Sequence, residues 1–115
     1  MRVDCDVLVI GGGGGGLVAA LSARAGGAEV MVAEKWPRLG GNTALSSGSQ
    51  GGLLVDAKAR VLHQDGHPIA HLYAAGGTAV GVSGSDGGRG YCSANGLLAA
   101  LGLGRIAGRD AAEAL

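Results

Sequence analysis

The hydrophobic pattern near the amino terminus predicts a strand, a helix and a second strand in that order. Residues 4–10 form a short apolar run that stops abruptly at glycine, which is typical of a parallel strand covered on both faces. Apolar positions at helical spacing predict a helix over 17–25, with Gly26-Gly27 as its stop signal. Residues 28–34 form a second strand of the same buried kind. Such a βαβ unit crosses over right-handed into a parallel sheet.

After residue 34 the hydrophobic positions lose their regular spacing, and the apolar runs become shorter. Residues 35–52 are rich in Gly, Ser, Asn and Thr and predict an extended loop with a short helical turn around 43–46. The extended pieces 53–55 and 60–63, with the turn signal Asp65-Gly66 before Pro68, predict a small antiparallel hairpin or meander.

The last part of the chain predicts one more strand and one long helix. Residues 69–75 look like another buried strand, and a second glycine-rich loop covers 81–90. Ser93 and Asn95 are both good N-cap residues for a helix that runs to Ala114. We therefore expect an α/β fold: a reduced Rossmann-type domain with a small parallel sheet, a β-hairpin and a long C-terminal helix.

Composition makes this a small and unusual core. Of 115 residues 25 are glycine, aromatic residues make up 3%, and phenylalanine is absent. One domain over residues 1–115 is the limit at this length, with a core of Val, Leu, Ile and Ala. Because glycine loses much conformational entropy on folding, we expect a ligand or another subunit to contribute to stability.

The charge balance excludes several classes of partner. Nine basic residues face nine acidic ones, so no basic excess favours nucleic acid or an anionic membrane surface. The apolar runs are too short to span a membrane, and Asp4 and Asp6 do not suit a secretory signal. Cys5 and Cys92 lie far apart without CxxC spacing. We expect a cytoplasmic protein with reduced thiols and no metal site.

The first candidate site is the glycine run between the predicted strand and helix. It contains Gly11-x-Gly13-x-x-Gly16, the spacing that lets backbone approach a pyrophosphate at the positive end of a helix. Glu34, at the end of the second strand, supplies a carboxylate for ribose hydroxyls and would repel the 2′-phosphate of NADP. This unit predicts a dinucleotide site and leaves NAD and FAD open.

Two further stretches resemble one flavoprotein superfamily. Residues 34–48, Glu-Lys-Trp-Pro-Arg-Leu-Gly-Gly-Asn-Thr through Ser-Ser-Gly, resemble the FAD-binding segment of the fumarate reductase, succinate dehydrogenase and 3-ketosteroid dehydrogenase superfamily. Residues 52–76 are similar to the hairpin and final strand of that family, and 90–109 to its flavin-facing helix. The resemblance implies that FAD is the cofactor and disfavours an NAD-binding domain.

The resemblance also implies which residues contact the cofactor. In the family the acid binds the adenosine ribose, the Gly-Gly-Asn/Thr stretch follows the pyrophosphate and ribityl chain, and the N-terminus of the last helix points at the flavin pyrimidine. The implied cofactor-binding residues are Gly11, Gly13, Gly14, Gly15, Gly16, Glu34, Lys35, Gly40, Gly41, Asn42, Thr43, Ser46, Ser47, Gly48, Gly76, Ser93, Asn95, Gly96 and Leu97.

One departure from the family pattern dominates the functional interpretation. Only Ser49-Gln50 stands where the family has several hundred residues, which carry the substrate-capping domain and one further parallel strand. The chain therefore divides into a βαβ unit with its pyrophosphate and ribityl loop, 1–48, and a hairpin, final strand and flavin-facing helix, 49–115. Catalytic residues are not identified. Because the missing cap would leave apolar surface exposed, we expect a homo-oligomer, most simply a dimer.

These observations leave two functions open. The first is a small flavoprotein that holds FAD non-covalently and transfers electrons or hydride, with a possible redox partner. The second is a non-enzymatic FAD-binding or electron-transfer module, or a subunit fragment that needs a separate catalytic chain.

Several side chains have both a functional and a structural interpretation. His63, His67 and His71 recur every four residues, but Pro68 prevents one helical face, so hydrogen-bonded or solvated roles are favoured over a metal site. Trp36 either covers the adenine or packs at a surface. Tyr91, just before the last helix, either lies beside the flavin ring or is purely structural, and Cys92 is either a redox partner of the flavin or a small packing residue.

Overall fold

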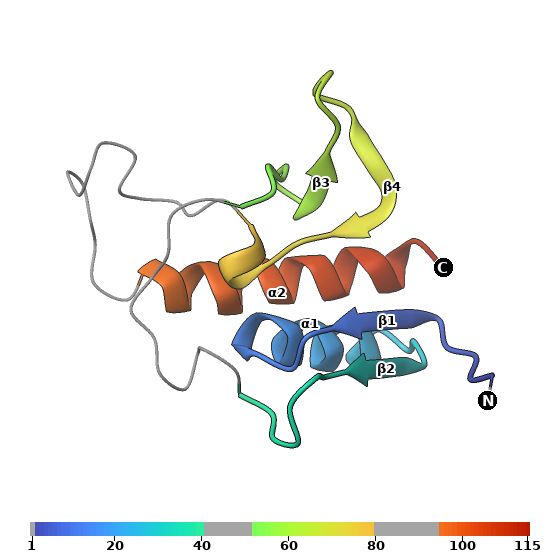
Figure 1. Cartoon of the computed structure of the whole chain (residues 1–115). Coiled ribbons are helices and arrows are strands. Elements are labelled where there is room, and N and C mark those ends of the chain that lie inside the picture. The colour runs from blue at the N-terminus through green and yellow to red at the C-terminus, as the bar shows by residue number, and fades with distance from the viewer. Residues whose placement is uncertain (1, 41–51, 80–94) are drawn as a thin grey trace.

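A computed structural model describes residues 2–40, 52–79 and 95–115 of the chain (Figure 1). Two helices, four strands and a 3₁₀ turn are formed by these residues. In chain order they are β1 (Val7–Ile10), α1 (Gly14–Ala25), β2 (Val30–Ala33), β3 (Arg60–Leu62), β4 (Pro68–Tyr73), the 3₁₀ turn η2 (Gly76–Thr78) and α2 (Asn95–Glu113).

The amino-terminal βαβ unit is confirmed. Strands β1 and β2 pair in parallel from Val7 opposite Val30 to Ile10 opposite Ala33, and α1 is the crossover between them. Helix α1 ends where predicted, with Gly26 as its C-cap, but it begins at Gly14 rather than near residue 17. The low helix propensity of the glycines is overcome by packing, because Gly15 lies against α2 and Gly16 against the carbonyl of Gly11.

A hairpin is present as predicted and forms a sheet of its own, but its second strand is β4, which was predicted as a separate strand. The predicted piece 53–55 joins β3 only through an isolated antiparallel bridge between Val55 and Val61. Strand β3 pairs antiparallel with β4, and the register shifts between the pairs Arg60–Tyr73 and Leu62–Pro68. His71 accommodates this irregularity in the left-handed region at φ 60°, a conformation that residues other than glycine rarely adopt. Within the described residues β1 and β4 do not pair, so the parallel sheet consists of β1 and β2.

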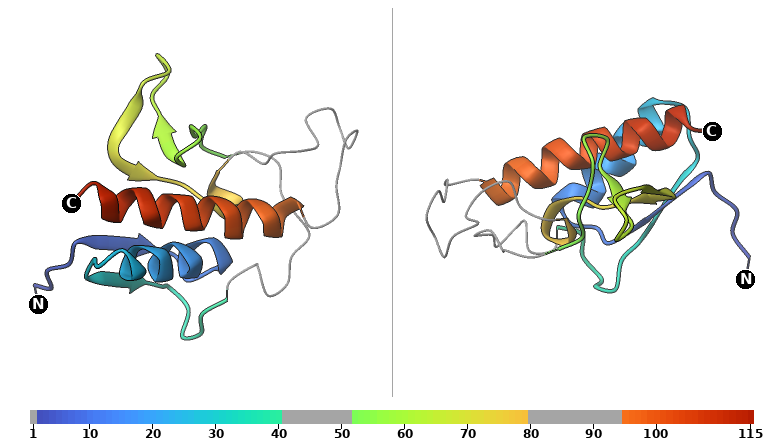
Figure 2. Two further views of the ribbon diagram at one scale, coloured as in Figure 1. Left: turned by 180° about the vertical axis from the view of Figure 1, so that it is seen from behind. Right: turned by 90° about the horizontal axis from the view of Figure 1, so that it is seen from above.

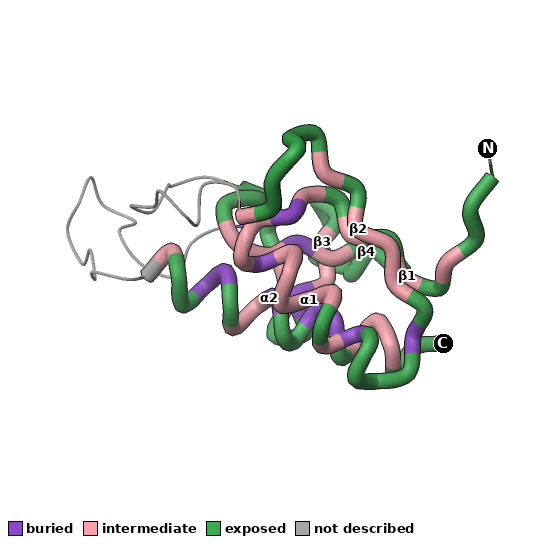
Figure 3. Tube along the Cα trace, turned by 90° about the horizontal axis from the view of Figure 1, so that it is seen from below, coloured by how far each residue is buried: buried purple, intermediate pink, exposed green. Residues whose placement is uncertain are grey.

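The prediction that the strands are covered on both faces is wrong. Leu8 and Ile10 of β1 are 53% and 83% exposed, and the first five residues of β4 are exposed. An apolar run shows that a strand can be buried, but the helices of this chain cover only one side of β1. Figure 3 shows buried positions as short segments among intermediate and exposed ones. Most of the buried apolar residues are alanines, and one small cluster joins Val61, Ala74 and Ala79.

Helices α1 and α2 lie side by side and begin at the same end of the molecule (Figures 1 and 2). Their close approach depends on small residues spaced four apart on α2. A Cβ atom at Gly104 would overlap the carbonyl of Gly15, and one at Gly108 would overlap that of Ala19. The backbones are therefore in direct contact, which only glycine permits at these two positions.

A polar cluster fastens the hairpin to α2. The Tyr73 hydroxyl donates a hydrogen bond to Asp110 Oδ2 at 3.0 Å, and Lys58 Nζ lies 3.0 Å from Asp110 Oδ1. Burial, followed by the Asp110 contact, raises the pKa of Tyr73 to about 12. The Lys58 contact lowers the pKa of Asp110, so the carboxylate stays charged. Helix α2 closely matches the predicted helix, and the alternative start at Ser93 lies outside the described residues.

Candidate functional site

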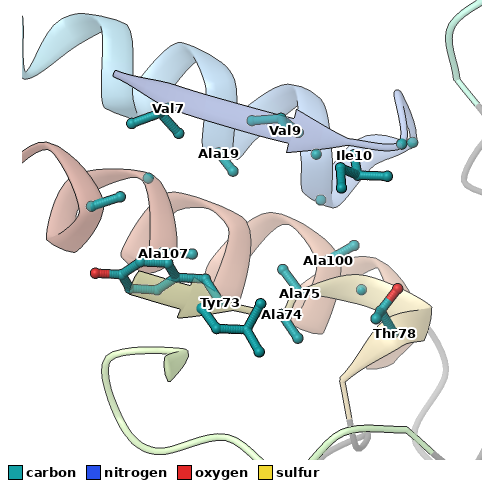
Figure 4. Close-up of a pocket in the computed structure, with 18 of the residues that line it drawn as sticks. Val7, Val9, Ile10, Ala19, Tyr73, Ala74, Ala75, Thr78, Ala100 and Ala107 are labelled. Atoms are coloured by element: carbon teal, nitrogen blue, oxygen red, sulfur yellow. The ribbon is translucent and has the colours of Figure 1, made fainter. Parts of the chain in front are cut away.

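The predicted site residues gather at one end of the two strands. Strands β1 and β4 run in the same direction, and their carboxyl ends lie at the end where α1 and α2 begin (Figures 1 and 4). A cavity of about 1020 Å³ opens there, lined by the glycine loop, η2 and the first turn of α2, and it continues between the two strands. This volume lies at the upper limit of the ~300–1000 Å³ typical of small-molecule sites.

The glycine loop leaves β1 in a conformation that excludes side chains. Gly11 has φ +101°, and its N–H donates to Ala33 O at 2.8 Å, so the loop stays attached to β2. A Cβ at Gly16 would overlap the carbonyl of Gly11. Gly13 is the N-cap of α1 without a side-chain hydrogen bond, and the first turn carries no acidic residue. The positive end of the helix dipole therefore faces the cavity with no carboxylate from the helix's own first turn beside it.

Glu34 is held against the same loop from the end of β2. Its Oε2 accepts the Gly12 N–H at 2.6 Å, and its Oε1 accepts the Trp36 N–H at 2.9 Å. The Gly12 bond, followed by the Trp36 bond, lowers the pKa of this carboxyl, so it is ionised at neutral pH. Because each carboxylate oxygen has further acceptor capacity, both remain able to accept from ribose hydroxyls.

The segment after β2 closes the outer side of the loop. Gly40 forms a parallel bridge with Gly13, and its N–H donates to Gly12 O at 2.7 Å. Lys35 Nζ lies 5.9 Å from the centroid of the Trp36 ring, and that ring is exposed. The backbone of Trp36 is thus bound to the Glu34 carboxylate, while its side chain is exposed.

The end of β4 reaches the loop from the other side. A Cβ at Gly15 would lie 3.3 Å from the Gly76 nitrogen and 3.2 Å from Ala100 O, so the loop, η2 and α2 are tightly packed. Gly76 has φ +66° at the start of η2. Gly96 and Leu97, in the first turn of α2, line the cavity.

The structure describes twelve of the predicted residues. The cavity is lined by Gly11, Gly13, Gly14, Gly15, Gly16, Gly76, Gly96 and Leu97. Glu34 and Gly40 hydrogen-bond to Gly12 of the glycine loop. Lys35 and Asn95 (by its backbone) are also described and adjoin Glu34 and Gly96 in the sequence. Seven predicted residues lie outside the described residues. These are Gly41, Asn42, Thr43, Ser46, Ser47, Gly48 and Ser93.

The other candidates lie away from this end or are not described. His63 and His67 flank Asp65 in the hairpin turn, each with Nδ1 3.3 Å from Asp65 Oδ1. His71 lines the part of the cavity between the strands. Among residues 2–40, 52–79 and 95–115 no group of His, Cys, Asp and Glu is arranged to hold a metal ion. Tyr91 and Cys92 lie outside the described residues.

These features fit a dinucleotide with a diphosphate bridge. Nothing lies within 4 Å of a Cβ built at Gly11, whereas one at Gly12 would lie 2.5 Å from Leu39 Cδ2 and 3.2 Å from Glu34 Oε2. The loop therefore packs on one side against the acid-bearing segment and is open at Gly11. An open backbone face, a helix N-terminus and a neighbouring ionised carboxylate are the complementary groups for a pyrophosphate and a ribose.

Comparison with known proteins identifies the class and then the family. The model of the family described as "FAD binding domain" matches residues 6–50 and 48–93, well over half of the chain. The chain belongs to this family, and FAD is its cofactor. The two matched segments meet at residues 48–50, where the sequence lacks the stretch that carries the cap domain in related flavoproteins.

One curated relative is a dehydrogenase from Sinomonas cyclohexanicum named 4-oxocyclohex-2-ene-1-carboxylate 5-dehydrogenase. It is 52% identical over 46 residues, which are 40% of this chain and 8% of that protein. The chain thus matches only a small part of the relative's length. No solved structure matches the chain. Neither of the described helices is long and apolar enough to cross a membrane.

Sequence reasoning missed two features of the site. The Gly12 N–H, which holds Glu34, does not belong to the glycine spacing that the motif specifies. The contacts of Gly104 and Gly108 with α1, which position the N-terminus of α2 beside the loop, were also missed. Their spacing of four on one helix was the available signal.

Proposed function

We propose that this chain is a redox flavoprotein module that holds FAD non-covalently at the carboxyl ends of β1 and β4. The observation that carries this proposal is the Glu34 carboxylate, ionised and held against the glycine loop at the start of α1. FAD, when bound, supplies the capacity to accept or donate two electrons.

Each described part of the site has a distinct role in the proposal. The backbone of Gly11–Gly16 and the α1 dipole bind the diphosphate, because the glycines allow a close approach without a side chain in the way and the helix N-terminus supplies positive potential. Glu34 accepts the ribose hydroxyls and disfavours a 2′-phosphate at that point. The first turn of α2, at Gly96 and Leu97, favours negative charge beside it and so stabilises the reduced form of the cofactor. The other predicted residues, those at 41–48 among them, complete the proposed contact set.

Among the described residues that line the cavity, Asp6, His71 and Tyr73 have side chains that can donate or accept a proton. Tyr73 has a pKa of about 12 and donates its hydroxyl hydrogen to Asp110, so it is a poor proton donor at neutral pH. His71 is exposed and is the better candidate. We infer slow turnover by the isolated chain, or turnover that requires a partner.

The test is an absorption spectrum of the purified protein, repeated on the supernatant after heat denaturation. Two flavin bands that move into the supernatant support non-covalent FAD, and anaerobic reduction with dithionite then measures the redox capacity. A colourless protein that also fails to bind added FAD would refute the proposal. Competition with NAD is expected not to displace the flavin.

The alternative is an electron-transfer module without its own substrate. It is favoured by the exposure of Leu8, Ile10 and Leu72 along the cavity, because an enzyme site normally excludes water. A steady-state screen separates the two, with ketosteroids, succinate, fumarate and cyclic oxo-carboxylates as substrates and an artificial acceptor. Turnover supports an enzyme, and reduction only by another flavoprotein supports the module.

We also propose a homo-oligomer, because large apolar side chains lie exposed on several elements. Leu21, Leu54 and Leu98 are 68%, 64% and 67% exposed. Light scattering that finds a stable monomer with bound FAD would contradict this.

A further inference from the structure

The cavity continues away from the flavin end as a groove between two strands that do not pair with each other. We call this part the interstrand groove, and it is lined by β1 residues 7–10 on one side and by residues 71–75 on the other. Figure 4 shows Val7, Val9 and Ile10 from β1 on one side, and Tyr73, Ala74 and Ala75 on the other. Ala19 and Ala107 of the two helices also line it.

One edge of β1 faces this groove with its backbone groups. Val7 and Gly11 donate their N–H groups to Glu29 O and Ala33 O beside β2. Because hydrogen-bonding direction alternates along a strand, the N–H and C=O groups of Leu8 and Ile10 lie on the opposite edge. The described part of the chain provides no partner for them.

The end of β4 presents a matching edge. Ala74 donates its N–H to Ala59 O, beside β3, so Tyr73 and Ala75 direct their backbone groups to the other side. Strands β1 and β4 run in the same direction (Figures 1 and 4). Two parallel strands thus border one apolar groove with their unpaired edges.

We propose that the interstrand groove binds an extended apolar segment of a separate polypeptide, which inserts as a strand parallel to β1 and β4 and joins the two sheets. A β-strand carries N–H and C=O groups along both of its edges, at the same spacing as the unpaired backbone groups of β1 and β4. It can therefore pair with both strands at once. The chain matches its family in two segments that meet at residues 48–50, which favours a separate polypeptide as the source of the inserted strand. Asp6 lines the amino-terminal end of the groove, with its Oδ2 accepting the Glu29 N–H at 2.8 Å, and its negative charge favours a cationic residue at the start of the inserted strand.

This inference goes beyond the proposed function and does not depend on it. It makes the chain one part of a split domain, in which the partner that delivers the strand can also deliver a catalytic domain. The exposed apolar side chains of Leu8, Ile10 and Leu72 would gain cross-strand neighbours from the same event.

The test uses the whole chain, with and without FAD, and the peptide acetyl-Lys-Thr-Val-Ile-Val-Thr-Gln-amide. Saturable binding is expected, with hydrogen exchange at the Leu8, Ile10 and Tyr73 amides slowed by about 100-fold at a peptide concentration of 100 times Kd. The Val7 amide, already bonded to Glu29 O, is expected to change less. The same peptide with alternate backbone nitrogens methylated is expected not to bind.

A Leu8→Pro variant removes the N–H that faces the groove without removing a bond to β2, and it is expected to abolish peptide binding. If that variant fails to fold, the methylated peptide against the unaltered chain gives the same information.

Three results would overturn the proposal. The first is that the peptide shows no saturable binding. The second is that the Leu8 and Ile10 amides are protected from exchange without peptide, to a degree that rises with protein concentration. The third is that FAD alone gives the same protection. The first excludes the strand, the second assigns the groove to a second copy, and the third assigns it to the cofactor. Loss of FAD binding leaves the peptide titration readable, so failure of the proposed function is distinguishable.

Discussion

Helix α2 carries two glycines that differ only in what faces them, and they give the sharpest test of the packing. Gly108 lies against the α1 backbone, where an added Cβ would overlap the Ala19 carbonyl. Gly102, on the same helix, has nothing within 4 Å of an added Cβ. The variants Gly108→Ala and Gly102→Ala therefore make the same chemical change in two different environments.

The expected effects have opposite sign. Alanine stabilises a helix interior relative to glycine by ~0.8–1 kcal/mol, and Gly102→Ala should gain most of this. Gly108→Ala has the same gain but must push the helices apart, and overpacking costs ~1–3 kcal/mol. Because the overlap is with backbone, which no rotamer relieves, we expect the upper part of that range. The two variants should then differ by ~2–3 kcal/mol in free energy of unfolding.

Urea denaturation followed by circular dichroism measures this difference directly. In thermal unfolding, the Gly102→Ala variant should melt ~8–12 °C above the Gly108→Ala variant, at ~4 °C per kcal/mol for a domain of this size. A Gly108→Ala variant as stable as Gly102→Ala would refute the direct contact of α1 with α2. Since the propensity gain is common to both, it cannot account for a difference.

Three further predictions concern individual groups. Glu34→Gln should weaken FAD binding by about tenfold, because it removes the charged acceptor of the proposed ribose hydroxyls. Titration of flavin fluorescence measures the affinity, with a variant at an exposed position, Glu29→Gln, as control. Equal affinities of the two variants would contradict the proposed role of Glu34. The pKa of Glu34 is lowered from 4.5, chiefly by the Gly12 N–H, so the stabilisation from its charge is complete above about pH 4.5 and is lost as the pH falls through the pKa of the folded state. An NMR titration of the Glu34 carboxyl carbon should show the lowered pKa, and a pKa at or above 4.5 would contradict the prediction. Tyr73→Phe should lower the free energy of unfolding by ~1 kcal/mol, because it removes the hydrogen bond to Asp110. The pKa of Tyr73 is raised from 10.0 to about 12, so its contribution to stability falls as the pH rises between these two values. Ultraviolet titration of both proteins measures this phenol ionisation.

The site combines parts that differ in how local they are. The loop at Gly11–Gly16 and the carboxylate of Glu34 come from one βαβ unit, and their hydrogen bond joins residues 22 positions apart. The other half, at Gly76 and Gly96, reaches the same cavity only because α2 packs on α1. Gly15, whose carbonyl faces Gly104, thus lines the cavity and takes part in the helix packing, so we expect the proposed cofactor binding to depend on that packing.

The amino-acid sequence by itself determined the βαβ unit, the glycine loop, the acid at the end of β2, the hairpin and the long last helix. These elements depend on periodicity, turn residues and caps, which act over a few residues and leave a readable pattern. The resemblance of the segments around Glu34 and after Gly52 to one flavoprotein superfamily identified FAD, and the family match over 6–93 confirmed it.

Only the tertiary structure decided how far the strands are covered and whether they join one sheet. The apolar runs of β1 and β4 indicate that they can be buried, but burial requires neighbours on both faces and both edges, and residues such as Ile10 and Leu72 lack them among the described residues. Strand pairing and helix contact are relations between distant segments, so the open edges of Leu8 and Tyr73 and the backbone contact at Gly108 leave no pattern within any one of them.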